Sequence, residues 1–145
     1  MKKQFGVELK IVDQDPKFKA RLKIWNRNGT AASFNPVQGV MFIRKKVTPY
    51  TIQHEMFHMK LWHKMTKEFP DLNGIYQKTI GNKIFHEEYV LSQFLSGTKK
   101  WGQAEILIDL TEINKLRFRK GLDPVDLNYF KNWKLEDELS KIVNS

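Results

Sequence analysis

Two of the four histidines in this sequence belong to the stretch His54-Glu55-Met56-Phe57-His58, an HExxH pattern. Residues four apart on a helix differ by about 40° around its axis, so both imidazoles reach the same side and can bind one Zn²⁺. Glu55 lies beside them and can take a proton from metal-bound water. Two histidines buried only for packing are the alternative, but each ring would then need a hydrogen-bond partner. The pattern predicts zinc as cofactor, with His54 and His58 as ligands and Glu55 as general base.

A catalytic zinc takes three protein ligands and leaves a position for water. His63 follows closely, but its helical angle places it at the edge of the lysine face. In the later segment 80–95, Glu87 falls at about 340°, inside the apolar stripe, and Glu88 falls at about 80°, on its rim. A carboxylate within an apolar face needs a partner or a metal. We therefore expect Glu87 to be the third ligand, with Glu88 as an alternative ligand or a supporting residue. A salt bridge of Glu87 to Lys or Arg remains the other interpretation.

A peptidase also stabilises the oxyanion that forms at the scissile carbonyl. His86 and Tyr89 lie next to the proposed ligand in the sequence, and Tyr50 and Tyr129 have suitable chemistry. We consider His86 and Tyr89 candidates for oxyanion stabilisation or for support of the ligands. A structural role is the alternative for each.

The elements that must position these residues fall into two parts. Alternating apolar residues predict strands in the first part, and a helical period dominates the second. The predicted strands are Val7–Ile11, Phe18–Ile24, Thr30–Phe34 and Val40–Arg44, with a turn at Asp13–Pro16 and a tight hairpin at Asn28-Gly29. The predicted helices run from Thr48-Pro49 to about Lys67, from Tyr76 to Leu95, from Gln103 to Lys120, and from Asp123-Pro124 to Lys141. This order predicts an α+β fold in which a small antiparallel sheet precedes three to four helices, with HExxH on the first long helix.

Composition bounds the remaining possibilities. A chain of 145 residues predicts one domain over residues 1–145, β-rich and basic over 1–47 and helical over 48–145. The absence of cysteine excludes disulfides, thiolate metal sites and a cysteine nucleophile. No apolar run approaches the ~18 residues of a membrane span, and the N-terminus lacks a signal peptide pattern. Residues 1–50 hold 11 Lys and Arg against three acidic residues, so the net charge of +9 is concentrated there. This basic region suits a polyanion or an acidic protein partner, or is simply a solvated strand face.

These residues together resemble the zincin-like metallopeptidase toxin domains at the C-termini of bacterial polymorphic toxins, such as those of the Rhs type. The resemblance covers roughly residues 30–120 and rests on HExxH, on Phe34-Asn35-Pro36 through Tyr50, and on Glu87-Glu88-Tyr89-Val90. It implies a gluzincin-type site with a downstream glutamate, best matched by Glu87. It also implies delivery into a rival or host cell as part of a larger toxin, cleavage of a target protein, and a cognate immunity protein. Thermolysin-like gluzincins place Asp four residues after that glutamate, where this chain has Leu91.

Three functional hypotheses follow. The first is a zinc endopeptidase toxin whose substrate lies extended along the Val40–Arg44 strand. The second is a SprT-like protease that acts on DNA-associated proteins, which the basic N-terminal third motivates. The third is a non-enzymatic basic module that binds an acidic protein. We favour the first, because SprT-like enzymes use a third histidine and often a cysteine zinc ribbon, and nucleic acid is a less favoured partner than protein.

Overall fold

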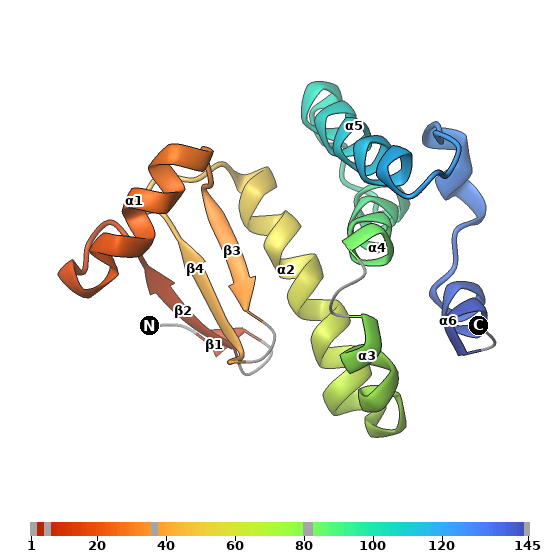
Figure 1. Ribbon diagram of the computed structural model, residues 1–145, viewed down its shortest axis with the longest axis horizontal. Coiled ribbons are helices and arrows are strands. Elements are labelled where there is room, and N and C mark those ends of the chain that lie inside the picture. Colours follow the sequence, from red (N-terminus) through yellow and green to blue (C-terminus); the bar gives the residue numbers. More distant parts are fainter. Residues whose placement is uncertain (1–2, 5–6, 36–37, 80–82, 144–145) are drawn as a thin grey trace. The chain divides into compact units, whose positions relative to one another are not determined.

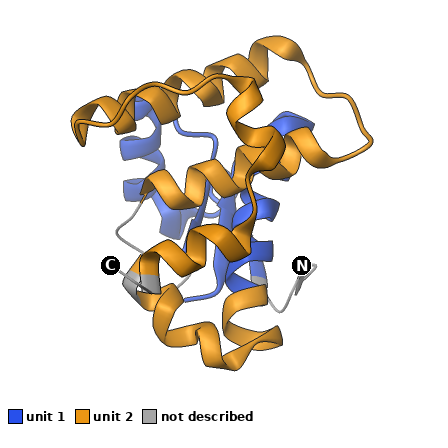
Figure 2. Cartoon of the chain, turned by 90° about the vertical axis from the view of Figure 1, so that its right-hand side faces the viewer, with its two compact units in different colours: residues 1–63 blue, residues 64–145 orange. Residues whose placement is uncertain are grey.

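The computed structural model describes residues 3–4, 7–35, 38–79 and 83–143. Contacts between residues divide the chain into two compact units, residues 1–63 and residues 64–145 (Figure 2). Unit 1 holds the described strands and two α-helices, and unit 2 is helical. The predicted α+β class is therefore confirmed, whereas the single domain expected from the length stays a prediction. Among the described residues, no helix combines the length and apolar character needed to cross a membrane.

Unit 1 is built on a four-stranded sheet with the order β1-β2-β4-β3 (Figure 1). Its central pair, β2 and β4, is parallel, and the two outer pairs are antiparallel. The prediction of an antiparallel sheet is wrong for the central pair, because the chain between β2 and β4 is a crossover long enough to bring them parallel. The elements of this unit are β1 (Lys3–Gln4), β2 (Val7–Ile11), α1 (Lys19–Asn28), β3 (Ala32–Asn35), β4 (Val40–Ile43) and α2 (Pro49–His63), with a 3-10 turn at Pro16–Phe18.

Helix α1 occupies the segment for which the sequence predicted a strand over Phe18–Ile24. Apolar residues do alternate there, but Phe18, Leu22 and Trp25 also follow the i, i+4, i+7 spacing of one helix face. That face packs against a buried cluster on the sheet, while Ile24 remains 53% exposed. The prediction was wrong because the alternating apolar residues did not include Trp25, and Trp25 is the buried residue of this segment.

Gly29 ends α1 instead of forming the predicted hairpin. Its φ is 71°, and its N–H donates a hydrogen bond to the carbonyl of Trp25. A glycine in the left-handed region just after the last helical residue is a common way to stop a helix. Glycine tolerates positive φ, and this tolerance suggested a hairpin. In the structure, the positive φ of Gly29 ends a helix instead.

Strand β4 forms the centre of the core of unit 1. Its four apolar residues are buried, and they enter two clusters, one containing Trp25 of α1 and the other containing Met59 of α2. Figure 1 shows α1 and α2 on opposite sides of the sheet. Burial on both faces explains why β4 reads as a continuous apolar run. This layer arrangement fixes α2, the helix that carries HExxH, against the sheet.

Unit 2 begins where α2 changes from an α-helix into a π turn at Lys64–Glu68. The predicted end of the first long helix near Phe69-Pro70 is close to that observed. Within the predicted helix Tyr76–Leu95, the structure describes α3 up to Thr79 and α4 from Lys83. Residues 80–82, which the prediction also included, lie outside the described residues. The helices of unit 2 are α3 (Asn73–Thr79), α4 (Lys83–Ser96), α5 (Gln103–Arg119) and α6 (Leu135–Val143), with 3-10 turns at Pro70–Leu72 and Leu127–Asn132.

The C-terminal segment departs from the predicted helix over Asp123–Lys141. It contains a 3-10 turn and then α6, and it is extended at Trp133 between them. The Asp126 carboxylate accepts a hydrogen bond from the N–H of Tyr129 at 3.2 Å, which starts the turn. This local capping competes with a continuous helix. By contrast, α5 ends next to Gly121, with φ of 73°, as the sequence predicted.

Candidate metal centre

Helix α2 is anchored at its N-terminus and along its buried face. The hydroxyl of Thr48 accepts a hydrogen bond from the N–H of Thr51 at 3.1 Å, and Pro49 is the first helical residue. This is the predicted N-cap followed by proline. Farther along, the ring of Trp62 meets that of Phe34 on β3 edge to face, with 5.9 Å between centroids. These contacts hold in place the helix that carries the polar residues of the HExxH motif.

The two motif histidines lie one turn apart on α2, and both are half-buried. The centroids of the His54 and His58 rings are 5.1 Å apart, with 57° between the ring planes. The i, i+4 spacing has thus brought the two imidazoles side by side, as predicted. Glu55 follows His54 directly and is also half-buried. Two nitrogen donors and a nearby carboxylate are the elements that HExxH chemistry requires.

Glu87 belongs to α4 and is half-buried. His54, His58 and Glu87 form a candidate His/His/Glu group, because each offers one ligand atom and these atoms lie within 4.8 Å of one another. Imidazole nitrogens with one carboxylate form a donor set that suits Zn²⁺.

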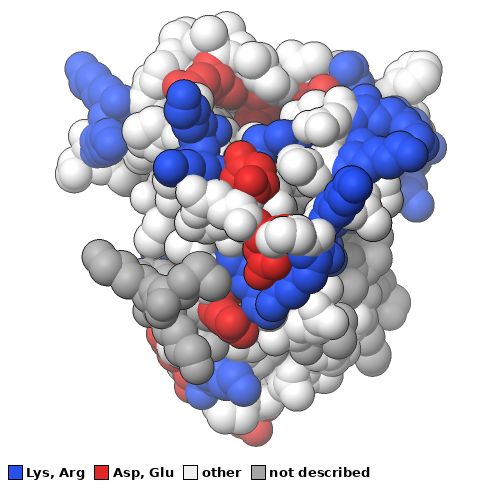
Figure 3. All heavy atoms as spheres, turned by 90° about the vertical axis from the view of Figure 1, so that its left-hand side faces the viewer, with Lys and Arg blue, Asp and Glu red and all other residues white. Residues whose placement is uncertain are grey.

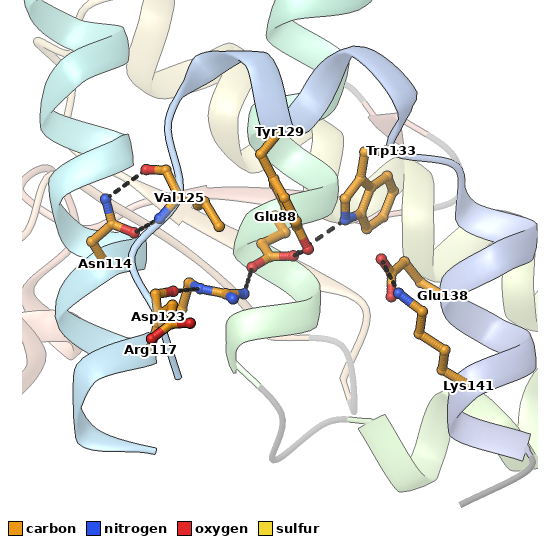
Figure 4. A network of polar contacts seen from close by, with 9 residues as sticks. All are labelled: Glu88, Asn114, Arg117, Asp123, Val125, Tyr129, Trp133, Glu138 and Lys141. Atoms are coloured by element: carbon orange, nitrogen blue, oxygen red, sulfur yellow. Dashed lines mark hydrogen bonds and ion pairs between the residues drawn. The ribbon is translucent and has the colours of Figure 1, made fainter. Parts of the chain in front are cut away.

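Glu88, the next residue, is more deeply buried than the sequence analysis expected. It is 4% exposed, whereas the helical angles placed it at the rim of the apolar stripe. Its Oε2 accepts a hydrogen bond from Nη1 of Arg117 at 2.9 Å. Its Oε1 accepts from the Tyr129 hydroxyl at 3.0 Å and from Nε1 of Trp133 at 3.2 Å (Figure 4). Glu88 thus forms with Arg117 a salt bridge of the kind that we considered for Glu87.

The network around Glu88 joins three segments of unit 2. Arg117 belongs to α5, and Tyr129 and Trp133 come from the 3-10 turn and the residue that follows it. The guanidinium also donates from Nε to the carbonyl of Asp123 at 2.7 Å. Burial and the neighbouring Glu88 carboxylate raise the pKa of Tyr129 to about 12, so its hydroxyl keeps the proton that it donates. Sequence reasoning missed this network, because no local pattern links Arg117, Tyr129 and Trp133 to Glu88.

Glu88→Ala is expected to destabilise the chain by about 3 kcal/mol, because it leaves the buried Arg117 guanidinium without its carboxylate. The measurement is urea unfolding followed by circular dichroism. Glu112→Ala is a matched control, since Glu112 forms an exposed ion pair with Lys115 on α5 at 3.1 Å. Its removal should change the unfolding free energy by less than about 1 kcal/mol. Equal effects of the two substitutions would contradict a structural role for Glu88.

The other candidate residues have mainly aromatic surroundings. Nε2 of His86 lies 3.1 Å from the hydroxyl of Thr79, and its ring meets Tyr76 and Phe85 edge to face. Tyr89 is buried, and burial together with the charge of Glu68 raises its pKa far above the ordinary value. These contacts lie within unit 2 and are compatible with support of the helix that carries Glu87. The oxyanion role considered for His86 and Tyr89 stays a prediction.

His63 and Tyr50 occupy positions at opposite ends of α2. His63, which its helical angle placed at the edge of the lysine face, is half-buried, and its ring centroid lies 6.5 Å from that of Trp62. Tyr50 is buried in the first turn. Burial of Tyr50 favours a packing role.

Basic side chains gather on the surface of unit 1. Figure 3 shows Lys and Arg in several groups on this face, interrupted by acidic residues. Several of them cover aromatic rings, as the Arg21 guanidinium does at 3.8 Å from the centroid of Phe42. Lys17 lies in the same way 5.3 Å from the centroid of Phe18. Part of the basic excess therefore covers the apolar side chains of a small unit through cation–π contacts and stem packing.

Comparison with known proteins identifies the family of this chain. The family model described as metallopeptidase toxin 4 matches residues 3–119. That range contains the HExxH stretch, Glu87 and Glu88, and it ends with α5. Searches among curated proteins and among solved structures gave no match. Since the family match covers most of the sequence, the chain belongs to the metallopeptidase toxin 4 family.

Proposed function

We propose that this chain is a zinc-dependent endopeptidase and that His54, His58 and Glu87 hold the metal. Membership of a metallopeptidase toxin family supports peptidase activity and a metal. The grouping of the two imidazoles with one carboxylate supports this particular ligand set. Zn²⁺ fits the donors best, because two nitrogens and one oxygen leave the open position that catalytic zinc sites keep. Membership of this family also argues against the third hypothesis, a non-enzymatic module that binds an acidic protein.

Bound zinc would polarise the scissile carbonyl and lower the pKa of a coordinated water. Glu55 would then act as the general base, accept a proton from the attacking water and pass it to the leaving amine. Its position next to His54 on a supported helix favours this role. His86 and Tyr89, which lie near Glu87 in the sequence, would orient this metal-binding side chain and the substrate and would not transfer protons.

The strand expected to bind substrate requires a correction. Val40–Ile43 is the centre of the sheet and pairs with β2 on one side and with β3 on the other, so it offers no free edge. In the described sheet, β3 (Ala32–Asn35) is the edge strand beside β4, and it packs against α2. We propose that an extended substrate pairs with β3, since added strands gain main-chain hydrogen bonds at an open edge.

As a toxin domain, the chain would act on a protein inside a target cell. We propose delivery as part of a larger polypeptide and neutralisation by a cognate immunity protein. The basic surface of unit 1 would suit an acidic inhibitor through charge complementarity. The DNA-associated protease considered from the sequence is supported by net charge alone.

The function is tested by metal analysis and by proteolysis with the purified chain. We expect about one zinc per chain, and new protein N-termini in a bacterial lysate after incubation. A chelator should suppress their appearance, and added Zn²⁺ should restore it. A chain that neither contains nor takes up zinc, or that produces the same N-termini with the chelator present, would contradict the proposal.

A further inference from the structure

A large pocket lies within unit 2, between α4, α5 and the C-terminal segment. Its volume is about 1020 Å³, at the upper end of the range for small-molecule sites. The buried Glu88 and its partners Arg117, Tyr129 and Trp133 are among its lining residues (Figure 4). The pocket is therefore built on a network that already fixes the positions of its side chains.

One part of this pocket is apolar. Ile84 comes from α4, Leu116 from α5, and Leu122 and Ile142 from the segments that follow. Leu122 is 45% exposed, so a large apolar side chain at the pocket is left open to solvent. The indole of Trp133 is held by its bond to Glu88 and adds an aromatic surface. Such a lining favours an aromatic or aliphatic group.

The charged residues at the pocket are predominantly basic. Five cationic and two anionic side chains line it, and both anions are used within the protein. Glu88 binds Arg117, and Glu138 binds Lys141 at 3.3 Å. Three further cations, Lys83, Arg119 and Lys120, are exposed and form no ion pair with any described residue. An anion would therefore find uncompensated positive charge at this site, whereas a cation would find no free carboxylate.

We propose that this pocket binds a small organic anion whose aromatic or aliphatic body enters the apolar part. Its carboxylate, phosphate or sulfonate group would lie beside Lys83, Arg119 and Lys120. Half of the lining residues follow residue 119, where the match to the metallopeptidase family ends. The pocket is thus formed in part by a segment outside the matched range, and its lining does not include the proposed zinc ligands.

Two fluorescent probes with the same ring system test this proposal. The first, 1-anilinonaphthalene-8-sulfonate, is anionic, and the second, N-phenyl-1-naphthylamine, lacks the sulfonate. With EDTA present, we expect the purified chain to bind the anionic probe more tightly. The triple variant Lys83→Gln/Arg119→Gln/Lys120→Gln should weaken binding of the anionic probe about tenfold and change that of the neutral probe less than about twofold.

A matched triple variant controls for net charge. Lys99→Gln/Lys100→Gln/Lys115→Gln removes the same charge from unit 2 outside the pocket and should leave both affinities within about twofold. Leu122→Asn should weaken binding of both probes. Equal loss of anionic-probe affinity in the two triple variants, or no loss in either, would overturn the proposal. Because EDTA is present, the outcome is independent of zinc and of peptidase activity.

Discussion

Glu55→Gln is expected to lower the rate of peptide-bond cleavage by about 10³-fold while leaving the zinc content unchanged. The amide keeps the size of the side chain but cannot accept the proton of the attacking water, and general base catalysis contributes about 10²–10⁴-fold. The structure places Glu55 beside His54 on α2, which is held against the sheet through Met59. A neutral substitution at a half-buried position should not disturb that packing. The measurement is the rate at which new N-termini appear, together with zinc per chain.

Glu112→Gln is a suitable control, because Glu112 is exposed on α5, where it pairs with Lys115. It also removes one glutamate charge, and it should keep nearly full activity. Full activity of Glu55→Gln would show that another group accepts the proton. Loss of zinc in Glu55→Gln would instead show that Glu55 is a metal ligand. Another residue would then have to act as the general base.

The sequence predicted best those elements whose signals are local. The N-cap of α2 at Thr48-Pro49 and the end of α5 near Gly121 are found where expected. Both depend on the conformational preferences of one or two residues. The strand at Val40–Ile43 was also predicted, because burial on both faces gives a continuous apolar run. The spacing of HExxH was sufficient to place the two imidazoles together.

The elements that the sequence did not predict depend on contacts between distant residues. Helix α1 has apolar residues compatible with two periods, and its packing on the sheet through Trp25 selects the helix. The parallel pairing of β2 with β4 follows from that helical crossover. The burial of Glu88 depends on Arg117, which is 29 residues away. The angular argument within a single helix placed Glu87 inside the apolar stripe and Glu88 on its rim, whereas Glu88 is the more deeply buried of the two.

Glu87 and Glu88 are therefore expected to respond in opposite ways to substitution, and this difference is the sharpest test of the ligand set. Glu87→Ala should weaken zinc binding by more than about 100-fold, because removal of a direct ligand should exceed the effect of removing a residue that orients one. It should leave the free energy of unfolding of the metal-free chain nearly unchanged, since Glu87 is only half-buried. Glu88→Ala should lower that free energy and retain zinc, because its carboxylate binds Arg117, Tyr129 and Trp133.

Both quantities can be measured on the same preparations, by titration with a competing zinc chelator and by urea unfolding in EDTA. His58→Ala serves as the positive control for zinc loss, since the second motif histidine is a ligand in any arrangement of HExxH. Retention of zinc by Glu87→Ala with loss by Glu88→Ala would assign the third ligand to Glu88. Retention by both variants would direct attention to His63, the remaining candidate on α2. Either result would leave the assignment of the chain to the peptidase family unchanged. It would overturn the proposed zinc ligands, because the third donor would then come from a different side chain.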